Sequence, residues 1–287
     1  FNLASKGSDL DYIAKATTDH VNSTLSKYKR ILVLAGSTGK FVVENELSNE
    51  DIKDQLGVNL MVDGTVQIAG EKIRISTNIT NLDINEIVSS EIFELREDKL
   101  FEAQDDITNR LMAELNLNPN TQHNSRASEN AEVYKLNSMA FGEMIAWTPQ
   151  GAAKAEKLWT QALAIEPNNL RLKMGIGWVL HQKVLLGISD NPKADLQTAL
   201  QIAMAMLEED PKQVLAMTLF SVVHGILGNY EKACLQLEDM NKLALDPNDL
   251  AMVAYINQNC GDNAQSIKVF ERLFVIAPHY PSWIRYY

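Results

Sequence analysis

The sequence lacks several features that mark whole classes of proteins. It has only two cysteines among 287 residues, and they form no metal-binding or redox motif. It contains no apolar run of about 18 residues, which excludes a transmembrane helix within the chain. No stretch has the pattern of a signal peptide. The chain begins at Phe1 rather than methionine, so we expect a fragment of a longer protein whose targeting information lies elsewhere.

Basic residues are also in short supply. The chain has 26 Lys and Arg residues and 37 Asp and Glu residues, which gives a net charge of −11. This balance argues against a surface for nucleic acid or for an anionic membrane, because such surfaces need clustered Lys and Arg. The remaining composition, 46% apolar and 22% charged, is that of a globular protein with ample material for a core.

Motifs for catalysis or metal binding are missing as well. The five histidines have no metal-ligand spacing. Residues 35–40 partly resemble a phosphate-binding P-loop. However, only two residues separate Gly36 from Gly39-Lys40, whereas the motif requires four. We therefore read residues 35–40 as a loop after a strand. We expect no catalytic residue, no metal and no cofactor in this chain.

Four prolines provide the most informative pattern in the sequence. They follow helical stretches at Pro167, Pro211, Pro247 and Pro278, separated by 44, 36 and 31 residues. A period near 34 residues with a proline after each helix is typical of a tetratricopeptide (TPR) array. Such an array is a binding surface, so the second half of the chain is interpreted as an interaction module.

The first 117 residues follow different periods. Apolar residues recur at helical spacing in 10–28 and again in 100–115, which predicts two amphipathic helices. The continuous apolar run 31–34 predicts a strand buried on both faces. Ser48 and Asp51 have the spacing of a helix N-cap, and Gly57 suits the end of that short helix.

Strict alternation follows in 58–68 and in 73–79, with a tight turn at 69–71 between them. A third strand is expected at about 86–95. The predicted order is α-β-α-β-β-β-α, a small α/β sandwich with helices on a mostly antiparallel sheet. The fold class is therefore α/β plus all-α. The predicted domains are an α/β domain at 1–117, a polar linker at 118–128, and a TPR array of about four repeats at 129–287.

Several segments carry a resemblance to a known family. They are residues 12–26, 56–75, 101–107, 187–192 and 278–283. Together they resemble the TolB amino-terminal-like domain and TPR repeats that follow the catalytic domain in bacterial class III adenylate/guanylate cyclases. The resemblance also implies that Phe1-Asn2-Leu3 is the end of the family's first strand. The cyclase catalytic domain is absent, so the family's metal-binding aspartates have no positions here.

The resemblance implies a non-catalytic regulatory region whose TPR groove binds a protein or peptide partner or mediates assembly, with a homodimer left open. The same domain pair also occurs in CadC-type regulators behind a winged-helix DNA-binding domain. That alternative implies a periplasmic sensor region. The compartment is thus cytoplasmic, or periplasmic if a membrane helix precedes Phe1 in the parent.

The repeats can be aligned on their second helices, which need a small, a large and a small residue before the proline. Ala155, Trp159 and Ala162 fit this pattern fully, and Ser266, Phe270 and Leu273 fit with one replacement. Thr198, Ile202 and Met206 fit loosely. An insertion at about 187–193 explains the step of 44 residues.

First helices are expected at about 129–147, 170–186, 214–227 and 249–259, and by analogy with the family they line the concave face. Candidate partner-binding residues on that face are Arg171, Trp178, His181, Gln182, Thr218, Tyr255 and Asn259. The alternative interpretation is that Trp178 and Tyr255 pack neighbouring helices.

The two cysteines leave a second alternative open. Cys234 and Cys260 fall where one repeat's second helix lies near the end of the next repeat's first helix. They are either two small buried apolar residues or, in an oxidising compartment, a disulfide. The sequence does not require the bond.

Overall fold

The computed structural model describes residues 2–4, 8–26, 28, 31–69, 72–96, 99–115, 117 and 128–279. These residues form two compact units. The first contains the described residues up to Leu117 together with 276–279, and the second contains residues 128–275. The predicted linker falls on residues 118–127, outside the described residues, with only Ser128 inside them. The first unit is mixed α/β and the second is helical.

A four-stranded sheet forms the centre of the first unit. Its strands are β1 (Asn2–Ala4), β2 (Leu60–Ala69), β3 (Lys72–Asn81) and β4 (Glu86–Leu95), in that spatial order. β1 runs parallel to β2, and the other neighbours are antiparallel. Residues 70–71 of the predicted turn lie outside the described residues.

Side-chain alternation sets the two faces of this sheet, as the sequence predicts. Ile73, Ile75 and Ile79 of β3 are buried, whereas Arg74 between them is exposed. The third predicted strand has the expected bounds. Successive residues of a strand point to opposite faces, so one face carries the core and the other a polar surface.

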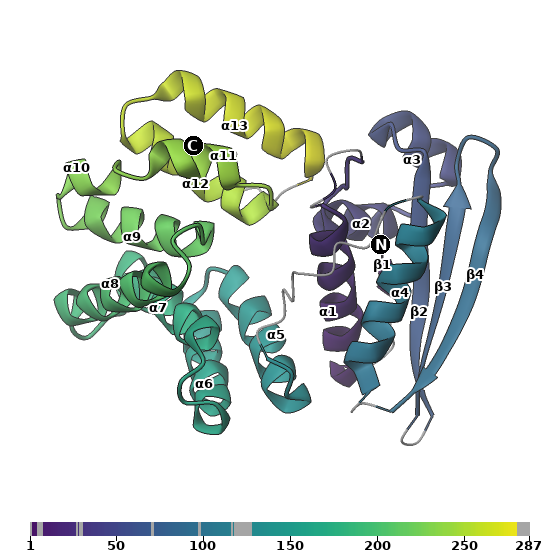
Figure 1. Ribbon diagram of the computed structural model, residues 1–287, viewed down its shortest axis with the longest axis horizontal. Helices are drawn as coiled ribbons and strands as arrows, with labels where there is room; N and C mark the ends of the chain where they lie inside the picture. The colour runs from purple at the N-terminus through teal and green to yellow at the C-terminus, as the bar shows by residue number, and fades with distance from the viewer. Residues whose placement is uncertain are drawn as a thin grey trace. The chain divides into compact units, whose positions relative to one another are not determined.

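Helices α1 (Ser8–Leu25) and α4 (Leu100–Glu114) cover the apolar face of the sheet, and Figure 1 shows them beside each other. They bury Ile13, Val21, Ile107 and Leu111. Their apolar residues recur every three or four positions, which places them on one stripe of each helix. This helical layer confirms the two amphipathic helices expected at 10–28 and 100–115.

The helix α3 (Asn49–Leu56) begins and ends where the sequence predicts. Ser48 Oγ accepts a hydrogen bond from the Asp51 N–H, and the Asp51 side chain accepts one from the Ser48 N–H, which completes a capping box. Gly57 ends the helix with φ of 64°, a conformation that costs glycine little because it has no Cβ.

The segment before this helix differs from the prediction. Residues 31–35 form no strand, and Leu32 is 63% exposed. Residues 36–40, expected as a loop, begin the helix α2 (Gly36–Glu44). The strand prediction was wrong because an apolar run of four residues does not by itself specify a strand. The order of the described elements is therefore β-α-α-α-β-β-β-α, and its first strand includes Asn2 and Leu3, whereas Phe1 lies outside the described residues.

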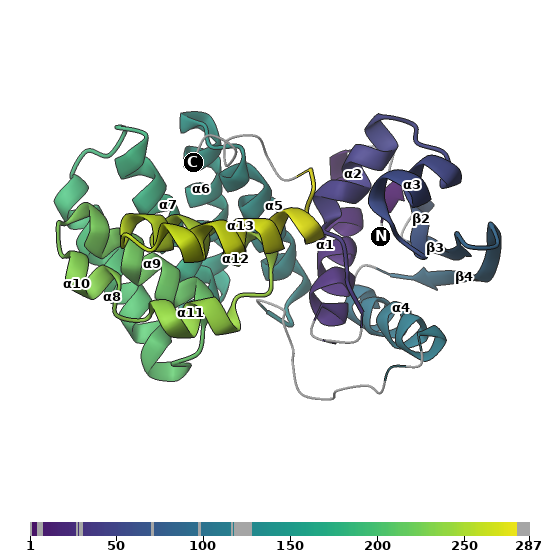
Figure 2. The ribbon, with the colours of Figure 1, turned by 90° about the horizontal axis from the view of Figure 1, so that it is seen from above.

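The second unit is built from successive helix pairs. They are α5 (Ala131–Ile145) with α6 (Pro149–Ile165), α7 (Leu170–Leu185) with α8 (Pro192–Glu209), α9 (Val214–Ile226) with α10 (Tyr230–Ala233) and α11 (Leu237–Leu243), and α12 (Pro247–Asn259) with α13 (Asn263–Ile276). Figure 2 shows these helices from above. The first helix of each pair contacts the first helix of the next, in the series α5, α7, α9, α12. We call these four the inner helices.

Trp159 holds the first two pairs together. Ala155, Trp159 and Ala162 of α6 are at most 2% exposed, and the indole N–H of Trp159 donates to Asn137 Oδ1 of α5 at 2.8 Å. A Cβ atom added to Gly175 of α7 would lie 2.3 Å from the Trp159 ring. Gly175 therefore lets α7 approach the indole face, and the small-large-small pattern of α6 packs as predicted.

The later pairs depart from the sequence alignment in α8, at Pro247, and in α13, where Val269 is buried and Phe270 is half-buried. In α8, Thr198 is exposed, and Ala199, Ala203 and Met206 are buried instead. The loose fit of Thr198 and Ile202 thus reflects a shift of the buried stripe by one residue. Pro247 does not end a helix but starts α12, where Asp246 is the N-cap. Proline is favoured at a first helical position because its missing N–H has no partner there anyway.

Candidate functional site

The structure places the seven candidate partner-binding residues on three of the inner helices. Arg171, Trp178, His181 and Gln182 lie on α7, Thr218 lies on α9, and Tyr255 and Asn259 lie on α12. Arg171 and Asn259 are exposed and Tyr255 is half-buried. The other four are buried. Burial of Trp178 agrees with the alternative that it packs neighbouring helices, and the role of all seven in binding a partner stays a prediction.

The buried members on α7 form a small polar cluster. The rings of Trp178 and His181 meet edge to face, with centroids 5.5 Å apart. Gln182 Nε2 donates to the Met144 carbonyl oxygen of α5 at 2.9 Å. Three further polar atoms are buried without a hydrogen-bond partner: Trp178 Nε1, His181 Nδ1 and Gln182 Oε1. Such atoms are costly because they lose their hydrogen bonds to water.

Burial also changes the chemistry of His181. The side chain is 3% exposed, and this desolvation lowers its pKa to about 4. The imidazole is therefore neutral near pH 7, since burial disfavours the charged form. A neutral imidazole supports packing of α7, and it carries no positive charge with which to attract an acidic partner.

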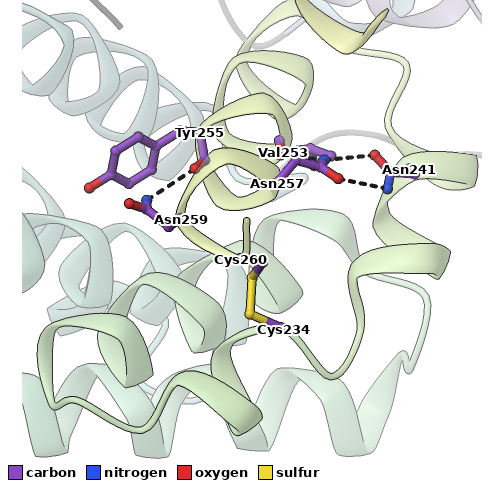
Figure 3. Close-up of a disulfide and its surroundings, with 7 residues drawn as sticks. All are labelled: Cys234, Asn241, Val253, Tyr255, Asn257, Asn259 and Cys260. Atoms are coloured by element: carbon purple, nitrogen blue, oxygen red, sulfur yellow. Dashed lines mark hydrogen bonds between the residues drawn. A yellow bond between two sulfur atoms is a disulfide. The ribbon is translucent and has the colours of Figure 1, made fainter. Parts of the chain in front are cut away.

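The two candidate residues on α12 are joined by a hydrogen bond from a side chain to the backbone. Asn259 Nδ2 donates to the Tyr255 carbonyl oxygen at 3.0 Å, and Figure 3 shows both side chains on the same side of the helix. Tyrosine and asparagine are frequent in binding surfaces because they combine apolar area with adaptable hydrogen bonds. These two residues are the most accessible part of the predicted surface on α12.

Arg171 lies in a separate place, at the start of α7. It lines a pocket of about 350 Å³ together with Asn168, Asn169, Leu170, Met206, Glu209, Asp210 and Gln213. Side chains of both charge signs line it, because Arg171 and the two carboxyl groups at the end of α8 border the same pocket. The seven candidate residues therefore do not converge on one pocket.

Sequence reasoning missed an amide pair beside this surface. Asn257 of α12 is fully buried. Its Nδ2 donates to Asn241 Oδ1 of α11 at 2.9 Å, and Asn241 Nδ2 donates back to Asn257 Oδ1 at 3.2 Å. Figure 3 shows the reciprocal bonds. An asparagine within the apolar stripe of a helix was the available signal, because a buried amide needs a partner.

A disulfide joins Cys234 and Cys260, with the two Cα atoms 5.8 Å apart (Figure 3). Cys234 lies where the second helix of the third pair is interrupted, between α10 and α11, and Cys260 is the C-cap of α12. The alternative that the sequence left open is thus decided in favour of the bond. It links the third helix pair to the fourth.

The described residues contain no cluster of three or more His, Cys, Asp and Glu side chains that could hold a metal ion. None of the described helices is long and apolar enough to cross a membrane. No protein-family model matches the chain, and no curated protein matches it.

Proposed function

We propose that this chain is a non-catalytic regulatory region that binds a protein or peptide partner, with the helical unit acting as a TPR array. The observation that carries the proposal is the series of helix pairs whose first helices contact one another. Small residues packed around Trp159 and Gly175 allow the close approach that such arrays need. Stacked pairs of this kind bury a continuous core and present an extended binding surface.

The partner is proposed to contact the exposed side chains of the inner helices. Tyr255 supplies a half-buried aromatic ring, and Asn259 and Arg171 supply polar groups that are open to solvent. Trp178, His181, Gln182 and Thr218 support this surface from within, because their burial leaves little area for a partner. An aromatic residue with surrounding polar groups is a common anchor in protein interfaces.

By the resemblance described above, we propose that the parent protein is a bacterial class III adenylate cyclase. The α/β unit would then be a TolB amino-terminal-like domain that contributes to the same contact. A partner could change how two cyclase domains pair only if it binds one arrangement more tightly than the other. Regulation would therefore follow from differential affinity.

The disulfide favours a second candidate, a periplasmic sensor region of a CadC-type winged-helix regulator. Cys234 and Cys260 are bonded, and such bonds persist in oxidising compartments, whereas the cytosol keeps thiols reduced. The two candidates share the interaction role and differ in the upstream domain and in the compartment. Determining the redox state of both thiols in the native cell distinguishes them: a bonded pair supports the periplasmic candidate.

The experiment that tests the interaction role is a quantitative binding assay with the upstream domain of the parent protein as the probe. We expect the double variant Arg171→Ala/Tyr255→Ala to weaken binding at least about tenfold, as for loss of an interface anchor. Tyr230→Ala is the matched control, because Tyr230 is 64% exposed on α10, outside the inner helices. Equal binding by both variants, or nucleotide turnover by the chain alone, would contradict the proposal.

A further inference from the structure

The strand β4 is the open edge of the sheet in the first unit. It spans ten residues, Glu86–Leu95, and its only neighbour among the described strands is β3. Figure 1 draws it as the last strand of the sheet. None of the described backbone groups outside the sheet pairs with residues 86–95. A long open edge presents a row of free N–H and C=O groups, which is a template for another strand.

Large aliphatic side chains gather at this edge. Ile84, Ile87, Val88 and Ile92 are between 47% and 63% exposed, and all four lie within nine residues. Single exposed aliphatic residues are ordinary, but a group of them marks an interaction site. Burying them requires an occupant that lies along the strand.

The usual protection of an edge is weak here. Open edges commonly carry free charges or proline, which oppose pairing. β4 contains no proline, and two of its three carboxyl groups are held in ion pairs within the unit. Arg110 binds Glu91 at 2.9 Å, and Arg74 binds Glu94.

The charge pattern of β4 suits a second copy of the same strand in one register. In a two-fold antiparallel pair, a strand centred on residue n places n opposite itself and n+2 opposite n−2. Centring on Glu91 or on Glu94 places two like charges directly opposite each other, which is unfavourable. Centring on Ser90 places Ile92 opposite Val88, where β4 is bulged and Val88 has no opposite residue on β3.

Centring on Ile92 avoids every one of these clashes. Ile92 then faces Ile92 of the copy, Ser90 faces Glu94, and Glu91 faces Phe93. Centring on Phe93 also avoids them, but it places the exposed Ile92 opposite a carboxylate and pairs fewer residues. The register on Ile92 therefore buries the most exposed isoleucine of the strand against an apolar partner.

We propose that two copies of this chain associate through antiparallel pairing of β4 with β4, centred on Ile92. The two sheets then form one continuous sheet across a two-fold axis. The surface belongs to the α/β unit and uses none of the residues assigned to partner binding on the inner helices. The inference thus goes beyond the proposed function and stands independently of it.

Disulfide trapping tests the register. Residues directly opposite in antiparallel strands have Cα atoms about 4.5–5.5 Å apart, which suits a disulfide. We expect Ile92→Cys to form a covalent dimer under mild oxidation on a non-reducing gel. Ser90→Cys is the matched control and should stay monomeric, because its opposite residue is Glu94. Mixing Ser90→Cys with Glu94→Cys chains should restore the cross-link.

Light scattering across a concentration series tests the association itself. We expect the unmodified chain to dimerise as concentration rises and Ile92→Lys to remain monomeric. Ile92 is 63% exposed, so circular dichroism should show an unchanged fold. Ile267→Lys, at a similarly exposed position of α13, should dimerise like the unmodified chain.

Three results would overturn the proposal. They are a monomeric unmodified chain, equal dimerisation by Ile92→Lys and the unmodified chain, and cross-linking of Ser90→Cys as fast as Ile92→Cys. A monomeric unmodified chain would indicate that β4 pairs with a segment of a different protein. Fast cross-linking of Ser90→Cys would indicate another register.

Discussion

Two contacts within the helical unit hold their helices by different means. Between α6 and α7, the ring of Trp159 packs closely against Gly175, and an ion pair between Lys183 and Glu156 at 3.1 Å joins the same two helices. Between the third and fourth helix pairs, a disulfide and a reciprocal amide pair are added to the packing. The regular helix pairs thus fit together mainly through side-chain shape, whereas the pair with an interrupted second helix has in addition specific bonds that a pattern of apolar residues does not reveal.

The largest expected effect comes from breaking the packed contact. Trp159→Ala removes a side chain that is 2% exposed, along with its hydrogen bond to Asn137. Truncation of a buried tryptophan costs about 4 kcal/mol, since a cavity remains. Chemical denaturation of the helical unit, followed by circular dichroism, measures this loss. Tyr230→Ala should change the stability by less than about 0.5 kcal/mol; a similar loss in both variants would contradict this view.

Removing the disulfide tests the other contact. The bond closes a loop with a sequence separation of 26 residues, and the chain-entropy model gives about 3 to 4 kcal/mol for such a loop. The double variant Cys234→Ser/Cys260→Ser should therefore have a free energy of unfolding that is lower by this amount, and it should unfold at a lower denaturant concentration. Reducing agent should destabilise the unmodified chain and leave the double variant unchanged. Sensitivity of the double variant to reductant would refute the assignment.

The pH dependence of stability tests the packing of α7, the helix that Trp159 contacts. Burial lowers the pKa of His181 to about 4, compared with about 6.5 in the unfolded chain. Above pH 6.5 the imidazole is neutral in both states, and stability is unaffected. As the pH falls from 6.5 to 4, the unfolded state binds the proton first, so up to about 3 kcal/mol is lost.

His181→Leu isolates this contribution, because the leucine does not titrate. We expect the difference in unfolding free energy between the two chains to change across pH 4–6.5 and to be constant above that window. A constant difference over the whole range would show that His181 binds its proton equally in both states.

The smallest expected effect concerns the amide pair. Asn257→Ala removes one partner of the reciprocal bonds and leaves Asn241 with unmet hydrogen bonds. The expected cost is about 2 kcal/mol. Replacing both residues by leucine should recover part of the loss, because no polar group is then stranded. A double-mutant cycle measures the coupling, and strict additivity would contradict a direct contact.

Local signals in the sequence predicted the features that depend on neighbouring residues. Ser48 and Asp51 predicted the N-terminus of α3 because a capping box is closed within four residues. The alternation in β3 predicted which side chains are buried because a strand has two faces. The buried position of Trp159 followed from spacing alone.

Features that depend on distant residues were not predictable in the same way. The apolar run at 31–34 forms no strand. Strand formation requires a neighbouring strand, and the spacing of apolar residues does not show whether one is present. Burial of His181 and Gln182 follows from how α7 packs among its neighbours, which helical periodicity alone does not fix. The pairing of Asn241 with Asn257 depends on the break between α10 and α11, for which the sequence carries no turn signal.

The brevity of α11 has a consequence for motion. It has seven residues, too few for a helix to persist alone in water, so its structure depends on its contacts with α12 and with Arg272 of α13, which donates to the Ala244 carbonyl at 2.9 Å. α11 should therefore open and close as a small unit of its own, with amide hydrogens that exchange faster than those of α12. The bond at Cys234 limits how far that opening spreads toward α10.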